Sequence, residues 1–292
     1  MKIAIYSRGL DADLGNPLQI ILEELAKHKV GILLYRPLLG MFQLPSALLN
    51  YITPFQVAAD FEDDVACLIS LGGDGTMLDA VVLAKDTNIP ILGINFGRLG
   101  FLASISPQEL PIAIEAILGH TFLTDKRTLL HLDSNVSLFG DAPFALNELV
   151  IHKRETSPMI KIHTYLNGEF LNSYWADGLI VSTPTGSTGY NMSCNGPILF
   201  PESSSFVITP VAPHNLNVRS IVVPDTNIIS FEVEGRAEQF ICSLDARREI
   251  VDKNIQLAVK KESFNANLIR LNENSFLTTL RNKLTWGLDK RN

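Results

Sequence analysis

The chain has 292 residues, of which 46% are hydrophobic and 19% charged, a composition typical of a folded protein long enough for two domains. Its net charge of −7 at pH 7 offers no basic surface for nucleic-acid phosphates, so we expect no nucleic-acid partner. No apolar stretch has the length of a membrane span, the N-terminus lacks the apolar stretch of a signal peptide, and the three cysteines are an odd number. We therefore expect a reduced, cytoplasmic protein without a membrane partner.

The first 123 residues alternate predicted strands and helices. Apolar runs that predict strands lie at 2–6, 30–35, 65–71 and 90–95. Apolar residues at helical spacing predict helices over 18–26, 77–84 and 107–118, and a Pro-punctuated connection at 36–63 holds a helical piece near 44–51. Ser7-Arg8-Gly9 is a turn after the first strand. The alternation indicates an α/β doubly wound domain over residues 1–123.

A glycine turn, Gly72-Gly73-Asp74-Gly75-Thr76, joins the strand at 65–71 to the next helix. Glycines let a ligand approach the backbone closely, and N–H groups at a helix start attract phosphate. Asp74 would repel a phosphate, but it suits accepting a proton from a hydroxyl or holding a metal. The alternative is a plain turn in which Asp74 caps the helix, which would not require three glycines. The turn has neither the Lys-Ser/Thr of a P-loop nor the spacing of a dinucleotide-binding loop, so it indicates only phosphate handling with an embedded acid.

From Thr124 the pattern changes to short strands, which predicts a β-rich domain over 124–265. The expected strands are 129–138, 144–152, 160–166, 169–176, 178–182, 206–210, 220–224, 228–234 and 239–245, with a hairpin turn at Asn167-Gly168. In the tail at 266–292, the spacing of Leu277, Leu280 and Leu284 predicts a final helix, which we expect to pack back on the first domain.

Three polar segments of the second half are candidates for a binding site. Asn147-Glu148 stands in an apolar stretch, where it either faces a ligand or marks an exposed loop edge. Asp177-Gly178 precedes an apolar run, which ends in the hydroxyl- and glycine-rich segment 182–190. That segment suits phosphate or sugar oxygens, although such loops are often plain surface turns.

These motifs together resemble the bacterial NAD kinase family. The residues that carry the resemblance, over nearly the whole chain, are Gly72-Gly73-Asp74-Gly75-Thr76, Leu99-Gly100-Phe101-Leu102, Asn147-Glu148, Asp177-Gly178 and Thr183 to Tyr190. The glycine turn alone is shared with lipid kinases, whereas the Asn-Glu pair followed by Asp-Gly and Thr-Pro-Thr-Gly-Ser-Thr is much more specific.

The resemblance implies transfer of the γ-phosphoryl group of ATP to the 2′-hydroxyl of the adenosine ribose of NAD, giving NADP. It implies Asp74 as the proton acceptor and a phosphate loop of Gly72, Gly73, Gly75 and Thr76. The implied NAD-binding residues are Asp74, Gly75, Phe101, Asn147, Glu148, Trp175, Asp177, Thr185, Thr188, Gly189, Tyr190, Asn191, Met192, Ser193 and Ala212. No cage of carboxylates is visible, so Mg²⁺ or another divalent metal should arrive with ATP. We also expect a homo-oligomer, a dimer or a tetramer.

Three departures from the family pattern concern the site. Gly189 stands where the family usually has alanine, and Asp79 stands where many members carry a basic residue. Ser243-Leu244-Asp245-Ala246-Arg247 replaces the more usual Asp-Gly-Gln. Two alternatives stay open at this point: a lipid kinase that shares the glycine turn, and a non-catalytic NAD-binding regulator.

Overall fold

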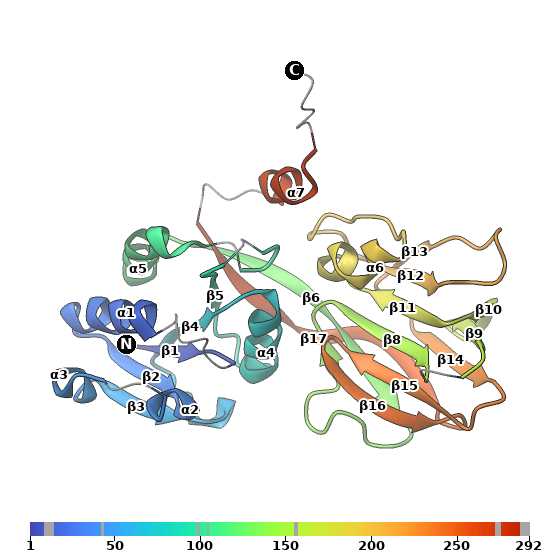
Figure 1. Ribbon diagram of the computed structural model, residues 1–292, viewed down its shortest axis with the longest axis horizontal. Helices are drawn as coiled ribbons and strands as arrows, with labels where there is room; N and C mark the ends of the chain where they lie inside the picture. Colours follow the sequence, from blue (N-terminus) through green and yellow to red (C-terminus); the bar gives the residue numbers. More distant parts are fainter. Residues whose placement is uncertain are drawn as a thin grey trace. The chain divides into compact units, whose positions relative to one another are not determined.

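The computed structural model describes residues 1–8, 15–41, 44–97, 100–103, 105–154, 157–271 and 276–286 (Figure 1). The chain forms two compact units. Unit 1 comprises Met1–Lys126 and Ala266–Asn292, and unit 2 comprises Arg127–Asn265. Gly9 of the expected first turn and Leu99 of the expected Leu-Gly-Phe-Leu motif lie outside the described residues.

Unit 1 is the α/β part of the chain. Its strands are β1 (Lys2–Tyr6), β2 (Gly31–Tyr35), β3 (Ile52–Phe55), β4 (Val65–Leu71) and β5 (Ile91–Ile94). Its helices are α1 (Gly15–Lys27), α2 (Arg36–Leu39), α3 (Ser46–Leu49), α4 (Asp74–Ala84), α5 (Leu110–Leu118) and α7 (Phe276–Leu284), with short 3-10 helices at Ala58–Asp60 and Pro107–Glu109. The strands and the three long helices predicted here are confirmed to within a few residues. The prediction missed β3, because Pro54 and the exposed Thr53 interrupt its apolar pattern.

The sheet of unit 1 is parallel, with strand order β3-β2-β1-β4-β5, and the end of β17 (Leu257–Arg270) adds a parallel neighbour to β5. The chain runs outward from β1 to β3 and then crosses back to the other side of β1 with β4. The order therefore reverses between β1 and β4, and ligands of such sheets bind beyond the carboxyl ends of the strands at that point.

Helices cover both faces of this sheet, as the doubly wound prediction requires. Alternate strand residues such as Ile5 and Ile69 form one buried cluster with side chains of α1 and α5. Gly93 of β5 points to the other face, where an added Cβ would lie 3.2 Å from the sulfur of Met77 on α4. This packing places the start of α4 directly after the carboxyl end of β4.

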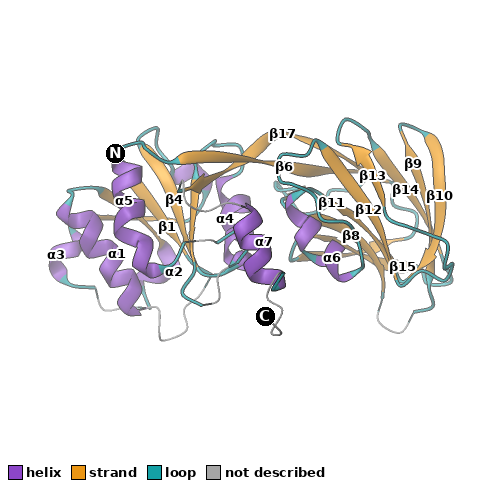
Figure 2. Ribbon diagram, turned by 90° about the horizontal axis from the view of Figure 1, so that it is seen from above, coloured by secondary structure: helices purple, strands orange, loops and turns teal. Residues whose placement is uncertain are grey.

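Unit 2 is β-rich, as predicted (Figure 2). Its strands are β6 (Leu123–Ser134), β7 (Phe144–Ala145), β8 (Glu148–Lys153), β9 (Ile160–Leu166), β10 (Glu169–Ala176), β11 (Gly178–Ser182), β12 (Ser205–Val211), β13 (Ile221–Pro224), β14 (Ile229–Glu234), β15 (Gln239–Leu244), β16 (Arg247–Asp252) and the first part of β17, with a 3-10 helix at Thr185–Thr188 and α6 (Tyr190–Ser193). The prediction missed β16 and β17, whose many charged and polar residues hide the apolar alternation.

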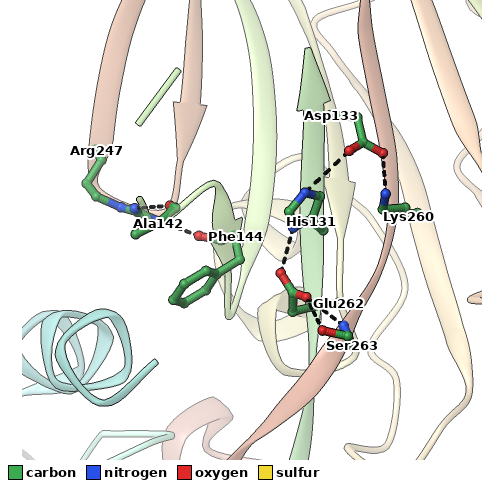
Figure 3. Close-up of polar contacts among 8 residues, drawn as sticks. All are labelled: His131, Asp133, Ala142, Phe144, Arg247, Lys260, Glu262 and Ser263. Atoms are coloured by element: carbon green, nitrogen blue, oxygen red, sulfur yellow. Dashed lines mark hydrogen bonds and ion pairs between the residues drawn. The ribbon is translucent and has the colours of Figure 1, made fainter. Parts of the chain in front are cut away.

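Antiparallel strands in the order β13-β12-β11-β8-β15-β16 form one sheet of unit 2, and β10-β9-β14-β17 with β6 and β7 form the other. Apolar side chains of both sheets share one core, which includes Leu149, Tyr174 and Val259. His131 on β6 joins β17 through its Nδ1, which lies 2.6 Å from Oε2 of Glu262 (Figure 3). Within the described ranges, no helix is both long and apolar enough to cross a membrane.

Candidate active site

Asp74 is the first residue of α4, and the backbone of a second loop holds its carboxylate. The N–H groups of Phe101, Leu102 and Ala103 donate to it over 2.9, 3.0 and 3.0 Å. The helix N-cap is Gly73, with no side-chain cap, so Asp74 does not act as a plain helix cap. The three hydrogen bonds fix the orientation of the carboxylate, which stays partly exposed. They also bring two residues of the predicted site, Asp74 and Phe101, side by side.

Glycines are required where the turn packs most tightly. Gly72 has a positive φ of +145°, and an added Cβ there would lie 2.4 Å from Oγ1 of Thr76. An added Cβ at Gly100 would lie 1.8 Å from Oδ1 of Asp74. Gly73, in contrast, faces open space. The glycine pattern thus lets Thr76 and Asp74 approach the backbone and leaves the outer side of the turn open to a ligand.

Glu148 is a buried carboxyl group of unit 2. It begins β8 with only 8% of its surface exposed, so an exposed loop edge is the wrong interpretation of Asn147-Glu148. Its Oε2 is buried and has no hydrogen-bond partner among the described residues. An added Cβ at Gly189 would lie 3.1 Å from this oxygen and 3.8 Å from Nδ2 of Asn147. The polar ends of Asn147 and Glu148 therefore both lie next to Gly189, and Oε2 of Glu148 could accept a hydrogen bond from a ligand there.

The pKa of Glu148 is raised to about 8, chiefly by burial and also by the negative charge of Asp245, against the lowering effect of the N–H group of Tyr190. Asp245 itself accepts hydrogen bonds from the N–H groups of Leu146, Asn147 and Glu148 over 2.9, 2.8 and 3.1 Å. Burial also raises the pKa of the Asp245 carboxyl, against the lowering effect of these hydrogen bonds. Glu148 is thus largely neutral at pH 7, and it can donate a hydrogen bond as well as accept one.

The hydroxyl-rich loop is held by hydrogen bonds within the loop and by hydrogen bonds to neighbouring segments. Thr185 is buried, and its Oγ1 accepts a hydrogen bond from Nη1 of Arg127 over 3.3 Å. Oγ1 of Thr188 donates to the carbonyl of Thr185 over 3.3 Å. An added Cβ at Gly186 would lie 2.2 Å from the carbonyl oxygen of Asn147, so the loop packs directly on Asn147. The loop is therefore a fixed wall beside Asn147 and Glu148, not a plain surface turn.

The residues after this loop fall into two groups. Asn191 is fully buried, and its amide donates to the carbonyls of Ser187 and Pro197 and accepts a hydrogen bond from Thr209. Its side chain is therefore engaged within unit 2. In contrast, Tyr190 is 38% exposed, Ser193 is exposed and Met192 is partly buried.

Trp175, Asp177 and Ala212 gather where β10, β11 and β12 meet. The N–H group of Asp177 donates to the carbonyl of Val211 over 3.0 Å, directly beside Ala212. Ala212 has a positive φ of +45°, a strained conformation that is frequent at functional sites. The ring of Trp175, half-exposed, lies 4.4 Å from that of His214.

A pocket of about 350 Å³ adjoins Glu148, Tyr190 and Asp245, and it contains cations that the sequence analysis missed. These are Lys153 and Arg248, with His152 as a further titratable group. Nζ of Lys153 lies 2.7 Å from Oδ1 of Asp177, which connects Asp177 to the pocket. Strand alternation could have revealed His152, since residues 148, 150 and 152 share one side of β8. Arg248 carried no comparable signal, because β16 was not predicted.

Comparison with known proteins covers both units. Residues 47–122 match the model of the ATP-NAD kinase N-terminal domain, and residues 146–271 match that of the ATP-NAD kinase C-terminal domain. The NAD kinases of Cytophaga hutchinsonii and Flavobacterium psychrophilum are 46% and 44% identical to the chain over 294 aligned residues, which cover 100% of each chain. The chain belongs to the ATP-NAD kinase family.

Two solved structures share its architecture. The crystal structure of yeast NADH kinase complexed with NADH has a TM-score of 0.89 at 20% identity, covering 99% of this chain and 88% of that one, and it supports the fold alone. The structure of an NAD kinase from Archaeoglobus fulgidus in complex with ATP has a TM-score of 0.73 at 25% identity, covering 98% and 99%. The predicted family, with an α/β domain followed by a β-rich domain, is confirmed.

The structure shows the contacts of each residue that departs from the ATP-NAD kinase pattern. Gly189 leaves room for Glu148, since an added Cβ would make a tight 3.1 Å contact with its Oε2. Asp79 pairs with Arg8, whose Nη2 donates to its Oδ1 over 2.7 Å. Nη1 of Arg247 donates to the carbonyl of Ala142 over 2.6 Å, and its Nη2 donates to that of Phe144 (Figure 3). Arg247 therefore connects β16 to the segment before β8.

Proposed function

We infer that the protein transfers the γ-phosphoryl group of ATP to the 2′-hydroxyl of the adenosine ribose of NAD, with NADP and ADP as products. The match of both units to the ATP-NAD kinase domain models supports the reaction. The observation that carries the site assignment is the carboxylate of Asp74, held by three N–H groups beside an open glycine turn. A lipid kinase or a non-catalytic regulator has no comparable support.

In the proposed mechanism, Asp74 accepts the proton of the 2′-hydroxyl as that oxygen forms its bond to the γ-phosphorus. The bond from the γ-phosphorus to the bridging oxygen breaks, and ADP leaves with the electron pair. Phosphoryl transfer asks the protein mainly to orient the hydroxyl, accept its proton and offset negative charge. General-base assistance of this kind contributes roughly 10²–10⁴-fold to the rate. Gly72, Gly73, Gly75 and Thr76 contribute the backbone of the phosphate loop.

The NAD-binding roles proposed for unit 2 follow from which polar groups lie open. The partnerless Oε2 of Glu148 is suited to a ribose hydroxyl, and the amide of Asn147 next to it to the adenine end of NAD. Tyr190 and Asp177 line or adjoin the same pocket. Lys153 offers a cation for the pyrophosphate of NAD. For Asn191, whose amide is engaged by three partners, the contribution is to hold the loop in place.

Further parts of the proposal concern metal, location and assembly. The described ranges contain no group of three or more His, Cys, Asp or Glu side chains able to hold a metal, so Mg²⁺ is proposed to enter as part of the substrate MgATP. The free cysteines Cys67, Cys194 and Cys242 support a reducing, cytoplasmic location. The homo-oligomer expected from the family resemblance stays a proposal, which light scattering would test.

The test of the function is to incubate the purified protein with NAD and MgATP and to measure NADP with an NADP-specific dehydrogenase. We expect NADP and ADP in equal amounts. Reactions without NAD or without ATP are the controls. A folded protein that binds NAD but forms no NADP would instead favour a non-catalytic regulator.

A further inference from the structure

Arg8 lies beside the glycine turn because of the order of the strands in unit 1. β1 and β4 are parallel neighbours, with Tyr6 opposite Ser70. Arg8 and Gly72 each follow two residues after this pair, just past the ends of the two strands. Oγ of Ser7 donates to the carbonyl of Leu71 over 2.8 Å and ties the two strand ends together. Arg8 therefore stands at the point where the strand order reverses, beyond the carboxyl ends of the strands.

The guanidinium of Arg8 is held in one orientation by α4. Its Nη2 donates to Oδ1 of Asp79 over 2.7 Å, and its Nε donates to Oδ2 of the same carboxylate. The hydroxyl of Tyr6 donates to Oδ2 of Asp79 over 3.2 Å, which fixes the carboxylate in turn. Asp79 thus binds the edge of the guanidinium formed by Nε and Nη2, and the third nitrogen, Nη1, does not donate to this carboxylate.

Nη1 is directed at the first turn of α4. It would lie 3.1 Å from a Cβ added at Gly75, so the guanidinium passes over a residue that has no side chain. Arg8 is 46% exposed, and Gly73 of the same turn faces open space. A negatively charged group at the turn could therefore reach Nη1 without displacing Asp79.

We propose that Arg8 binds a phosphate group of the phosphoryl donor at the glycine turn, and that Asp79 is the positioning residue for its guanidinium. The inference rests on the proposed function and adds a residue to the donor side of that site. A triphosphate next to the carboxylate of Asp74 needs a nearby cation, because the two negative groups repel each other. A guanidinium suits this role, since it keeps its charge and its N–H groups match phosphate oxygens.

The test measures nucleotide binding directly, by calorimetry with the magnesium complex of a non-hydrolysable ATP analogue. We expect Arg8→Met to weaken binding about tenfold or more, which corresponds to the loss of a charge-assisted hydrogen bond. The affinity of Arg8→Lys for the analogue should fall between those of the wild type and Arg8→Met, because lysine keeps the charge but loses the paired hydrogen bonds to Asp79. Asp79→Asn should weaken binding less than Arg8→Met, because the charge stays and only its orientation is lost.

Lys2→Met is the matched control. Lys2 is also a cation of β1 paired with acidic residues, Glu62 and Asp64, but it lies at the amino end of the strand. This variant should bind the analogue like the wild type. NAD affinity should be unchanged in both Arg8→Met and Lys2→Met, since the proposed role concerns the donor alone.

Analogue binding by Arg8→Met equal to that of the wild type would overturn the proposal, as would an equal loss in Lys2→Met. Circular dichroism checks the fold, and Arg8→Met/Asp79→Asn removes the pair as a unit if the single variant does not fold. The measurement needs no turnover, so failure of the wild type to form NADP would refute the proposed reaction without deciding the role of Arg8. For an active wild type, the KM for MgATP should rise in Arg8→Met while the KM for NAD stays constant.

Discussion

The buried carboxyl of Glu148 predicts a specific pH dependence of stability. Its pKa in the folded chain is about 8, above the ordinary value of 4.5. The folded chain therefore keeps a proton that the unfolded chain releases. The resulting stabilisation is complete below pH 4.5 and is lost as the pH rises through 8. Glu148→Gln removes this dependence, because an amide of nearly the same shape cannot ionise.

The expected magnitude follows from the same pKa values. Each pH unit between the two values changes the free energy of unfolding by roughly 1.4 kcal/mol, which gives an upper limit of roughly 4 kcal/mol between pH 5 and pH 8. Over this range the wild type should become progressively less stable relative to Glu148→Gln. Asp245 is present in both proteins and interacts with Glu148, so the difference between the proteins reports the ionisation of Glu148 together with its repulsion by Asp245.

The assay is urea unfolding at several pH values, monitored through the fluorescence of Trp175. Both proteins carry Trp286→Phe, a change at a residue that is 54% exposed, so that the signal comes from unit 2. A difference in stability that stays constant from pH 5 to pH 8 would refute the reasoning. A wild type that gains stability relative to Glu148→Gln as the pH rises would refute it equally.

Two further predictions concern the site. Gly100→Ala should lower kcat about as much as loss of Asp74 does, because its Cβ would lie 1.8 Å from Oδ1 of Asp74. The control is Gly97→Ala, whose Cβ would make only an ordinary 3.6 Å contact with Oδ1 of Asn95, and this variant should match the wild type. Equal kinetics of the two variants would contradict the packing argument. Saturating NAD should raise the melting temperature, since a ligand at a hundred times its Kd stabilises by about 2.7 kcal/mol. Nicotinamide mononucleotide, which lacks the adenosine ribose, should give a smaller shift, and an equal shift would speak against the roles of Asn147 and Glu148.

The sequence predicts the fold well wherever one element carries its own pattern. The apolar run 65–71, the glycine turn and the spacing of Met77, Ala80 and Ala84 locate β4 and α4 correctly. β16 and β17 were not predicted, because charged residues occupy many of their positions and neither strand shows a clear alternation of apolar and polar residues.

Contacts between distant segments could not be predicted in the same way. The three N–H groups that hold Asp74 come from a loop almost thirty residues away, and those of residues 146–148 bind Asp245. The pairing of Arg8 with Asp79 likewise depends on β1 lying beside β4. Nearly every residue carries a backbone N–H group, so the sequence does not reveal which of these groups bind a side chain. The order of the strands depends on the whole sheet, so these contacts could be identified only in the structure.

The central claim is that Asp74 accepts the proton during phosphoryl transfer to NAD, and Asp74→Asn tests it most directly. The amide keeps the size of the side chain and can still accept hydrogen bonds at one oxygen, so the variant should fold and bind NAD. Its kcat for NADP formation should fall by about 10²-fold or more, with NAD affinity by calorimetry close to that of the wild type. A folded Asp74→Asn protein that forms NADP at nearly the wild-type rate would contradict the account.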